Sequence, residues 1–326
     1  MLIVMQNTAT PEEIDLVCAA VKGLGFEAHK MPGAQRTAVC VTGNDGSVSE
    51  RHFSGLAGIR QIIRVSKPYK LTSNETKTKP TIVTVNGVQF GEGQQGIITG
   101  PACVETGEAT LRIAEKLAGL GVKLFHASAY RPRNSPYHFQ GIGEMALPVL
   151  QEVKQRFGLG IVTEVVDVST VDAIAEVADI LVVDSYNMQN FALLRKLSKC
   201  KNPVILKRAL SATVEDLLMS AEYILAGGNQ QVMLCDAGMR AFGDHSAYAL
   251  DITFVPALRK LTHLPIIVDP SQASGTADMV PALVKALLAL GTDGVMIECH
   301  DQPAKSATGG AQAITPEALA LLLKWN

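Results

Sequence analysis

Eight short apolar runs alternate with helix-forming segments over residues 96–326. The runs cover residues 97–99, 122–125, 161–164, 180–183, 204–207, 232–235, 266–269 and 295–298. Eight strand–helix units in a segment of this length predict a (β/α)8 TIM barrel, which is an α/β fold. A doubly wound sheet is the competing fold, but it gives no reason for eight similar units. A dinucleotide-binding fingerprint is not expected, because Gly91-x-Gly93 is too short and precedes the barrel.

A second, shorter pattern occupies residues 1–67. Strand-like and helical segments alternate in the order βαββαβ at residues 1–6, 11–25, 27–31, 37–42, 49–56 and 61–65. This order predicts a ferredoxin-like domain with a regulatory or oligomerisation role. We therefore expect this domain at residues 1–67, a connector at 68–95 and a catalytic-type barrel domain at 96–326.

Bulk composition limits the classes of function. The chain of 326 residues is 47% hydrophobic and 18% charged, which is typical of a globular enzyme, and its net charge of −2 predicts no attraction to nucleic acid. No apolar run reaches the roughly 18 residues of a membrane span, and the N-terminal segment lacks the basic start of a signal peptide. The six cysteines form no CxxC pair, so we expect reduced thiols and a cytoplasmic location.

Polar residues follow the predicted strands. Active sites of TIM barrels lie at the carboxyl ends of the strands, so these residues predict a pocket with three or four cations and as many carboxylates. The residues at these ends are Cys103, His126, Arg131, Arg133, Glu164, Asp184, Tyr186, Asn187, Lys207, Arg208, Asp236, Arg240, Asp269, Gln272, Glu298 and His300.

Two features of these strand ends favour anion binding and chemistry. Arg131, Arg133, Asn134 and Ser135 belong to a proline-stiffened basic loop, which suits a phosphate or a carboxylate. A solvated surface loop is the alternative. Lys207 ends an otherwise apolar strand, and a buried lysine is costly unless it is paired or functional.

The ordered motifs of the whole chain resemble the 3-deoxy-arabino-heptulosonate 7-phosphate (DAHP) synthase family, of the microbial type with an N-terminal ferredoxin-like regulatory domain. The shared segments are K-P-Y-K-L at 67–71, G-P-x-x-V-E at 100–105, R-P-R-N-S-P-Y-x-F-Q-G at 131–141, T-E-V at 163–165, N-M-Q-N-F at 187–191, L-K-R at 206–208, A-E-Y-I-L at 221–225, T-H-L-P-I-I-V-D-P-S at 262–271 and M-I-E-C-H at 296–300. The resemblance implies condensation of phosphoenolpyruvate (PEP) with erythrose 4-phosphate. It also implies a divalent metal (Mn, Zn or Fe), held by Cys, His, Glu and Asp, and a homo-oligomer, either a dimer or a tetramer.

The sequence departs from the family at the metal ligands. Ala102 stands where the family has Cys, Gln272 where it has His, and Gly309 where it has Asp, so that only Glu298 is kept. Cys103 lies one residue late and would point elsewhere on a strand-like backbone. An amide and one carboxylate hold a transition metal poorly, so we expect neither a metal nor another cofactor. A rewired metal site would need Cys103 or His300 as substitutes.

The family's anion-binding arginines are also reduced in number. His126, Tyr186 and Ala237 replace three of them, while Arg131, Arg133, Lys207 and Arg240 remain as cations. Each lost charge-assisted hydrogen bond is worth roughly 1.5–3 kcal/mol, so PEP binding should weaken by several orders of magnitude. We expect a small anionic metabolite to contact a set of substrate-binding residues. This set is Arg131, Arg133, Asn134, Ser135, Tyr186, Arg240, Asp269 and Gln272.

Three functions are consistent with these departures. The first is an enzyme with a rebuilt, metal-independent site, a transferase or lyase that forms or cleaves a carbon–carbon bond. Its substrate would be a carboxylate- or phosphate-bearing metabolite related to the aromatic (shikimate and chorismate) pathway, in specialised metabolism. Its catalytic residues would be Lys207, His126, Glu164 and Glu298, with Lys207 as a Schiff-base amine if burial and Arg208 depress its pKa.

The second function is DAHP synthase activity with a metal held by substitute ligands. These ligands would be Cys103, Glu298, His300 or Asp269. The third is a non-catalytic paralogue that regulates a true synthase through its ferredoxin-like domain.

Overall fold

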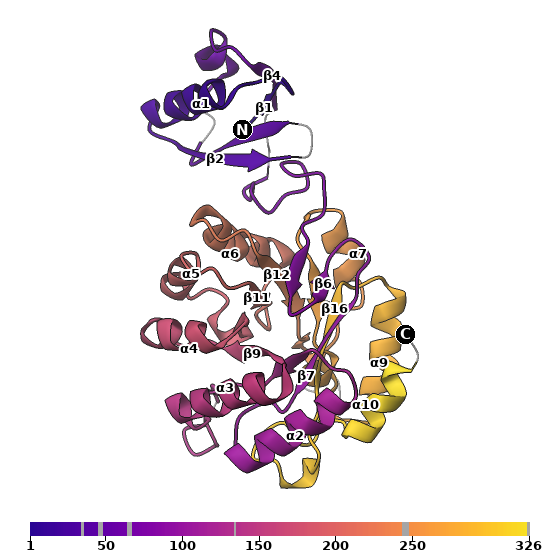
Figure 1. Cartoon of the computed structure of the whole chain (residues 1–326). Coiled ribbons are helices and arrows are strands. Elements are labelled where there is room, and N and C mark those ends of the chain that lie inside the picture. Colours follow the sequence, from indigo (N-terminus) through magenta and orange to yellow (C-terminus); the bar gives the residue numbers. More distant parts are fainter. Residues whose placement is uncertain (34–35, 45–47, 64–66, 134, 243–247, 325–326) are drawn as a thin grey trace. The chain divides into compact units, whose positions relative to one another are not determined.

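Two units make up the chain (Figure 1), and each is described by itself. The computed structural model describes residues 1–33, 36–44, 48–63, 67–133, 135–242 and 248–324. The first unit comprises residues 1–80 together with the short segment 260–263, and the second comprises residues 81–259 and 264–326.

The first unit contains a four-stranded antiparallel sheet covered on one face by a helix. Its elements are β1 (Leu2–Met5), α1 (Pro11–Gly23), β2 (Glu27–Pro32), β3 (Thr37–Thr42), η1 (Glu50–Phe53) and β4 (Ile59–Ile63). The strand order β2-β3-β1-β4 confirms the ferredoxin-like prediction. Helix α1 begins where predicted, because Thr10 and Glu13 form a reciprocal capping box around Pro11.

The second helix of this unit is much shorter than the predicted segment 49–56. Only one 3-10 turn, η1, forms there, and its single buried residue is Phe53. Two glycines, Gly55 and Gly58, follow closely, and Gly58 has a φ of +78° that ends a helix. Residues 64 and 65 of the predicted last strand lie outside the described residues.

The segment 260–263 is attached to residues 71–74 of the same unit. Thr262 Oγ1 donates a hydrogen bond to the carbonyl oxygen of Thr72 at 2.5 Å. The ring of His263 bonds the carbonyl oxygen of Leu71 through Nε2 at 2.8 Å. Since a carbonyl only accepts, Nε2 must carry the proton. The ring is buried, and burial lowers its pKa to about 4.

The second unit is a closed barrel of eight parallel strands, which confirms the predicted TIM barrel. In spatial order these are β10 (Ile180–Val183), β11 (Val204–Lys207), β12 (Val232–Asp236), β15 (Ile266–Val268), β16 (Gly294–Glu298), β7 (Gly96–Gly100), β8 (Leu124–His126) and β9 (Gly160–Glu164). All eight predicted runs are strands. The run at 266–269 stops at Val268 because Asp269 caps the next helix by accepting a hydrogen bond from the backbone of Gln272.

Helices surround this barrel on its outer side, as Figure 1 shows for α2 to α6. They are α2 (Gly107–Gly119), α3 (Ala146–Phe157), α4 (Val171–Val177), α5 (Phe191–Leu197), α6 (Val214–Ala226), α7 (Phe254–Arg259), α8 (Pro270–Ser274), α9 (Val280–Ala289) and α10 (Pro316–Leu323). Among the described residues, no helix is long and apolar enough to cross a membrane.

A hairpin inside the predicted connector closes one end of the barrel. Strands β5 (Val83–Val85) and β6 (Val88–Phe90) pair antiparallel, and Val83, Val85 and Phe90 are buried in the apolar core of the barrel. Phe90 lies so close to Gly96 and Gly294 that a Cβ on either would approach its ring to 2.2 and 2.9 Å respectively. The ring therefore requires glycine at both strand positions.

Candidate active site at the barrel mouth

The carboxyl ends of the strands bring six charged side chains into one buried group, which we call the ionic cluster. Its members are Arg131, Lys207, Asp184, Glu164, Asp269 and Glu298, and all are buried. Arg131 bridges two carboxylates, with Nη1 at 2.8 Å from Glu164 Oε1 and Nη2 at 3.4 Å from Glu298 Oε1. Lys207 Nζ lies 2.9 Å from Asp269 Oδ2 and 3.8 Å from Asp184 Oδ1.

The cluster is poorer in cations than the sequence suggested. It has two cations and four carboxylates, because the other basic residues are engaged elsewhere. Arg208 pairs with Asp236 at 2.8 Å and stacks on Phe254, and Arg133 donates to Thr308 Oγ1 at 3.0 Å. Arg240 is exposed.

Burial favours the protonated form of two of these carboxyl groups, Glu164 and Glu298. Burial raises the pKa of Glu164 to about 7, against the opposing effect of the Arg131 guanidinium, and Asp184 raises it further. Burial also raises the pKa of Glu298. A carboxyl group with a pKa near neutrality can both donate and accept a proton at physiological pH. The cluster is therefore suited to acid–base chemistry.

Lys207 does not meet the condition for Schiff-base chemistry. Burial alone would lower the pKa of its amine, but Asp269, Asp184 and Glu164 outweigh that effect and raise it. The amine is thus held as an ammonium group, which is not nucleophilic. Arg208, which was expected to depress this pKa, lies in a separate ion pair with Asp236. The Schiff-base hypothesis is therefore wrong on this point. Lys207 instead forms ion pairs with Asp269 and Asp184.

His126 ends β8 as a buried, neutral imidazole. Burial lowers its pKa well below the usual range, and the nearby cations Lys207 and Arg131 lower it further. Its Nε2 atom has no hydrogen-bond partner in the described part of the chain.

Other buried polar atoms beside His126 are also without a partner among the described residues. They lie at or just beyond the ends of β7, β8, β9 and β10, and are Thr99 Oγ1, Ser128 Oγ, Glu164 Oε2, Asp184 Oδ1 and Ser185 Oγ. Buried polar atoms are normally hydrogen-bonded, so a concentration of unsatisfied ones indicates a place where a ligand supplies the missing bonds. The mouth of the barrel is therefore the candidate active site.

The positions of the family's metal ligands also meet here, but their side chains do not fit a metal. A Cβ on Gly309 would lie 2.5 Å from Glu298 Oε2 and 3.0 Å from the Cβ of Ala102. Both oxygens of Glu298 are taken, one by Arg131 and the other by Gln312 Nε2 at 2.8 Å. The Gln272 amide oxygen accepts a hydrogen bond from Lys207 Nζ at 3.4 Å.

The substitute ligands do not complete a metal site. Cys103 Sγ donates to the carbonyl oxygen of Ser128 at 2.9 Å, and burial raises the pKa of this thiol to about 12. His300 Nδ1 accepts a hydrogen bond from the backbone of Gln302. Within the described ranges, no three His, Cys, Asp or Glu side chains gather in a metal-binding arrangement. The donor set present does not match a transition-metal site.

Several predicted substrate-binding residues lie outside the ionic cluster. Ser135 Oγ accepts a hydrogen bond from the backbone of Tyr137, and Asn134 lies outside the described residues. Tyr186 is 52% exposed. Sequence reasoning missed Gln312, which holds Glu298, and Tyr248, which contacts Tyr186. The sequence alone does not single out either residue. Both lie in or after irregular loops, and the path of such loops cannot be predicted from hydrophobic periodicity.

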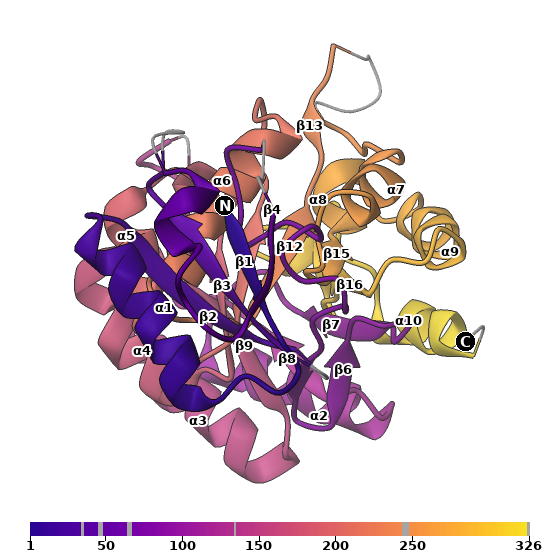
Figure 2. The ribbon, with the colours of Figure 1, turned by 90° about the horizontal axis from the view of Figure 1, so that it is seen from above.

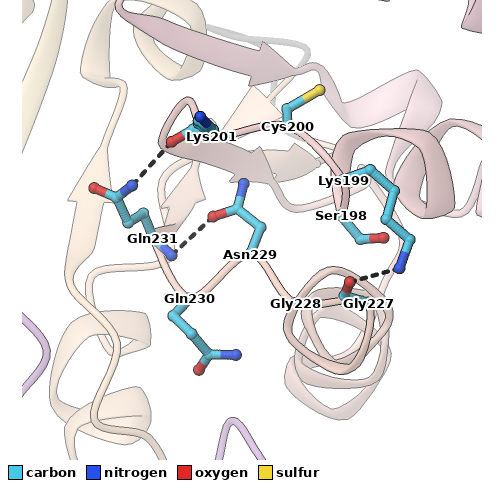
Figure 3. Close-up of a pocket in the computed structure, with 9 residues that line it drawn as sticks. All are labelled: Ser198, Lys199, Cys200, Lys201, Gly227, Gly228, Asn229, Gln230 and Gln231. Atoms are coloured by element: carbon cyan, nitrogen blue, oxygen red, sulfur yellow. Dashed lines mark hydrogen bonds between the residues drawn. The ribbon is translucent and has the colours of Figure 1, made fainter.

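A separate cavity of about 640 Å³ lies at the opposite ends of β11 and β12 (Figure 3). Its polar side chains serve the backbone of the surrounding loops. Lys199 Nζ donates to the carbonyl oxygen of Gly227 at 2.7 Å, and Gln231 Nε2 donates to that of Lys201 at 2.9 Å. Asn229 bonds the carbonyl oxygen of Asn202 at 2.9 Å. These side chains therefore hold the loops together, and no member of the ionic cluster lines this cavity.

The fold and the buried titratable groups define an enzyme-type α/β barrel with a ferredoxin-like unit. Residues 71–326 match the DAHP synthetase I family, and residues 1–67 match the DAHP synthase ferredoxin-like domain. The chain therefore belongs to the DAHP synthase family.

Relatives of known name agree with this assignment. The phospho-2-dehydro-3-deoxyheptonate aldolase of Thermotoga maritima is 38% identical over 314 residues, covering 96% of this chain and 93% of that protein. The 2-dehydro-3-deoxyphosphooctonate aldolase of Geobacter sulfurreducens is 27% identical over 261 residues, covering 74% of this chain and 95% of that protein. The crystal structure of the Thermotoga maritima aldolase has a TM-score of 0.78 at 37% identity, covering 99% of this chain and 95% of that one.

Proposed function

We propose that this protein forms or cleaves a carbon–carbon bond at the barrel mouth without a metal ion. Its substrate is a small carboxylate- or phosphate-bearing metabolite related to the aromatic pathway, used in specialised metabolism. The observation that carries this proposal is the ionic cluster, in which Arg131 takes one oxygen of the retained ligand Glu298 while Ala102 and Gly309 supply no donor.

The residues of the cluster have distinct proposed roles. Arg131 and Lys207 provide the positive charge that attracts the anionic group of the substrate. Glu164, whose pKa is about 7, transfers a proton through Oε2, which has no hydrogen-bond partner among the described residues. His126 offers a neutral imidazole whose Nε2, without a partner among the described residues, forms a hydrogen bond with the substrate.

A second candidate is DAHP synthase activity with a rewired metal site. Similarity to the Thermotoga maritima aldolase over 96% of the chain favours it. The engagement of Cys103, His300 and Glu298 in other hydrogen bonds argues against it. A regulatory paralogue without catalysis would need neither the cluster nor its unsatisfied polar atoms.

The test combines metal analysis with ligand binding on one purified sample. We expect protein prepared without chelator to contain far less than one metal ion per chain. We also expect Mn²⁺ to leave the calorimetric titration with PEP unchanged. Near-stoichiometric metal together with micromolar, Mn²⁺-dependent PEP binding would contradict the proposal and establish the second candidate. We further propose a homo-oligomer, a dimer or a tetramer, in the cytoplasm, which light scattering and cell fractionation would test.

A further inference from the structure

Two carboxylates of the ionic cluster lie on adjacent strands and face the interior of the barrel. Glu164 ends β9, and Asp184 directly follows the neighbouring strand β10 with an extended backbone. Val162 and Val182, two residues before them, belong to the apolar core of the barrel. Because side chains alternate along an extended backbone, both carboxylates also point inward. Figure 2 shows the helices α2 to α10 arranged around the barrel strands.

One oxygen of each carboxylate has no hydrogen-bond partner in the described part of the chain. Glu164 Oε1 accepts a hydrogen bond from Arg131 Nη1 at 2.8 Å, but Glu164 Oε2 has no donor. Asp184 Oδ1 has none either, because Lys207 Nζ lies 3.8 Å away and donates to Asp269 Oδ2 at 2.9 Å instead. A buried acceptor without a donor is destabilising, so the site favours a ligand that brings N–H or O–H donors.

A third buried atom without a partner among the described residues comes from strand β8, beside β9. It is Nε2 of His126, whose residue is only 4% exposed. His126 follows the core residue Leu124 by two positions, so its ring also faces the interior. The unsatisfied atoms thus come from three adjacent strands, and one of them belongs to a neutral imidazole rather than to an acidic side chain.

The charge balance of the cluster decides which kind of donor fits. Its four carboxylates and two cations give a formal charge of −2 when every carboxylate is ionised, and of −1 when Glu164 is protonated. The cations that act on Glu164 are Arg131 and Lys207, and Asp184 opposes them. Arg240 is exposed, so water screens its charge.

A ligand with only an anionic group would add to this buried negative charge, which is costly without a compensating cation. A hydroxyl group on the ligand would supply a donor but no charge. An ammonium group supplies three donors and a positive charge. The cluster therefore favours a ligand that carries an ammonium group in addition to its anionic group.

We infer that the barrel mouth binds a 2-ammonio carboxylate, a substrate with an ammonium group on the carbon next to its carboxylate. The ammonium group donates to Glu164 Oε2 and Asp184 Oδ1, and the carboxylate lies against Lys207 and Arg131. Since Lys207 Nζ is only 3.8 Å from Asp184 Oδ1, the two charges of the ligand must also be adjacent. This inference rests on the proposed function, because it assumes that an anionic metabolite binds at the mouth.

The experiment compares three probes with the same carbon skeleton, L-alanine, L-lactate and pyruvate, which carry an ammonium, a hydroxyl and an oxo group beside the carboxylate. Ligand-observed NMR titrations with EDTA measure their affinities at pH 8, where Glu164, whose pKa is about 7, is mostly ionised. The variants Glu164→Gln and Asp184→Asn keep the shape of each side chain and remove its charge. The control, Asp172→Asn, removes the same charge from an exposed carboxylate that pairs with Lys196. Circular dichroism verifies that each variant folds.

We expect the wild type to bind L-alanine about tenfold more tightly than L-lactate or pyruvate, because a charge-assisted hydrogen bond is stronger than a neutral one. Glu164→Gln and Asp184→Asn should each reduce this preference about threefold to tenfold, since an amide oxygen accepts a hydrogen bond but carries no charge. Asp172→Asn should keep the preference of the wild type.

Two results would overturn the inference alone. One is a wild type that binds L-lactate or pyruvate as tightly as L-alanine, and the other is a preference for L-alanine that survives both Glu164→Gln and Asp184→Asn. If none of the three probes binds to the folded wild type, the inference and the proposed substrate class fail together.

Discussion

At the scale of single residues, Arg131 is the residue that joins the two buried glutamates of the candidate active site. Its guanidinium stands between two buried carboxylates, Glu164 and Glu298, which form no other ion pair among the described residues. Attraction between buried charges is strong, but so is the cost of removing them from water. The ion pairs of Arg131 therefore add little net stability. They offset the cost of burying the two carboxylates.

Replacing Arg131 by methionine should expose this cost. Arg131→Met leaves two buried carboxylates without a cation, so the free energy of unfolding at pH 8 should fall by about 3–5 kcal/mol. The loss should be smaller at pH 5, because the Glu164 carboxyl, whose pKa is about 7, is protonated there. Urea unfolding of the full chain measures both values. The matched control, Arg156→Met, breaks an exposed pair with Glu152 and should cost less than about 0.5 kcal/mol. Equal losses in the two variants would show that Arg131 is not needed to hold the carboxylates.

Glu164 should make ligand binding depend on pH. An anion beside Glu164 favours its protonated form, and this form is lost as pH rises through about 7. The affinity for a small carboxylate probe, pyruvate, should therefore fall about tenfold between pH 6 and pH 8. Calorimetry at both values measures the change. The Glu164→Gln variant, which is neutral at every pH, should bind equally at both. A wild-type affinity that stays constant or rises with pH would contradict this assignment.

The charged positions of the site were partly predictable from sequence. Glu164, Lys207 and Glu298 end apolar strands, and the barrel geometry brings strand ends together whatever their order in the chain. The partners of these residues were not predictable in the same way. Gln312, for example, reaches the mouth from a long loop, where side-chain direction depends on the tertiary path rather than on periodicity.

At the scale of elements, the β5–β6 hairpin depends on its turn. Asn86 adopts a left-handed conformation with φ of +47°, and its Nδ2 donates to the carbonyl oxygens of Lys123 at 2.8 Å and Gly158 at 2.9 Å. Asparagine tolerates this conformation better than most residues. One side chain thus forms the turn and fixes it to two loops of the barrel.

Two substitutions at this turn separate conformation from hydrogen bonding. Asn86→Gly keeps the backbone freedom but loses both hydrogen bonds, so it should destabilise the protein by about 1–2 kcal/mol. Asn86→Ala also incurs the left-handed penalty and should cost about 1 kcal/mol more. Urea midpoints of the two variants give the difference. If alanine were no worse than glycine, the positive φ would carry no cost.

The sequence predicts regular elements better than irregular ones for a physical reason. The eight barrel strands are continuous apolar runs because both faces are buried, and such runs are visible without a structure. The two strands of the hairpin at residues 83–90 have only three residues each and are flanked by polar residues. Such a pattern predicts an irregular connector. The expected helix at 49–56 failed because local propensity did not outweigh Gly55 and Gly58.

At the scale of the whole molecule, one histidine should set the limit of acid stability in the first unit. His263 is neutral and buried in the folded state, with a pKa of about 4 against about 6.5 when unfolded. Its contribution is therefore fully present above pH 6.5, declines as pH falls below that value, and is lost by pH 4. The hydrogen bond to Leu71 requires the proton on Nε2, and protonation of the second nitrogen adds a charge to a buried ring.

The His263→Gln variant tests this contribution. A glutamine amide can donate to the same carbonyl but does not titrate. The free energy of unfolding of the wild type should fall by up to about 3 kcal/mol more than that of the variant between pH 7 and pH 4. The control is His138→Gln, at an exposed position. Parallel pH profiles of wild type and His263→Gln would show that another group limits acid stability.

The contact of Phe90 with Gly96 and Gly294 has a consequence for protein engineering. The ring that closes the barrel comes from outside the eight strand–helix units, and the two glycines that admit it lie on neighbouring strands, β7 and β16. A chimera that exchanged only the strand–helix units with those of a relative would separate Phe90 from the two glycines against which its ring packs. The smallest transplantable module is therefore the barrel together with its hairpin, and crossover points should be placed before residue 83.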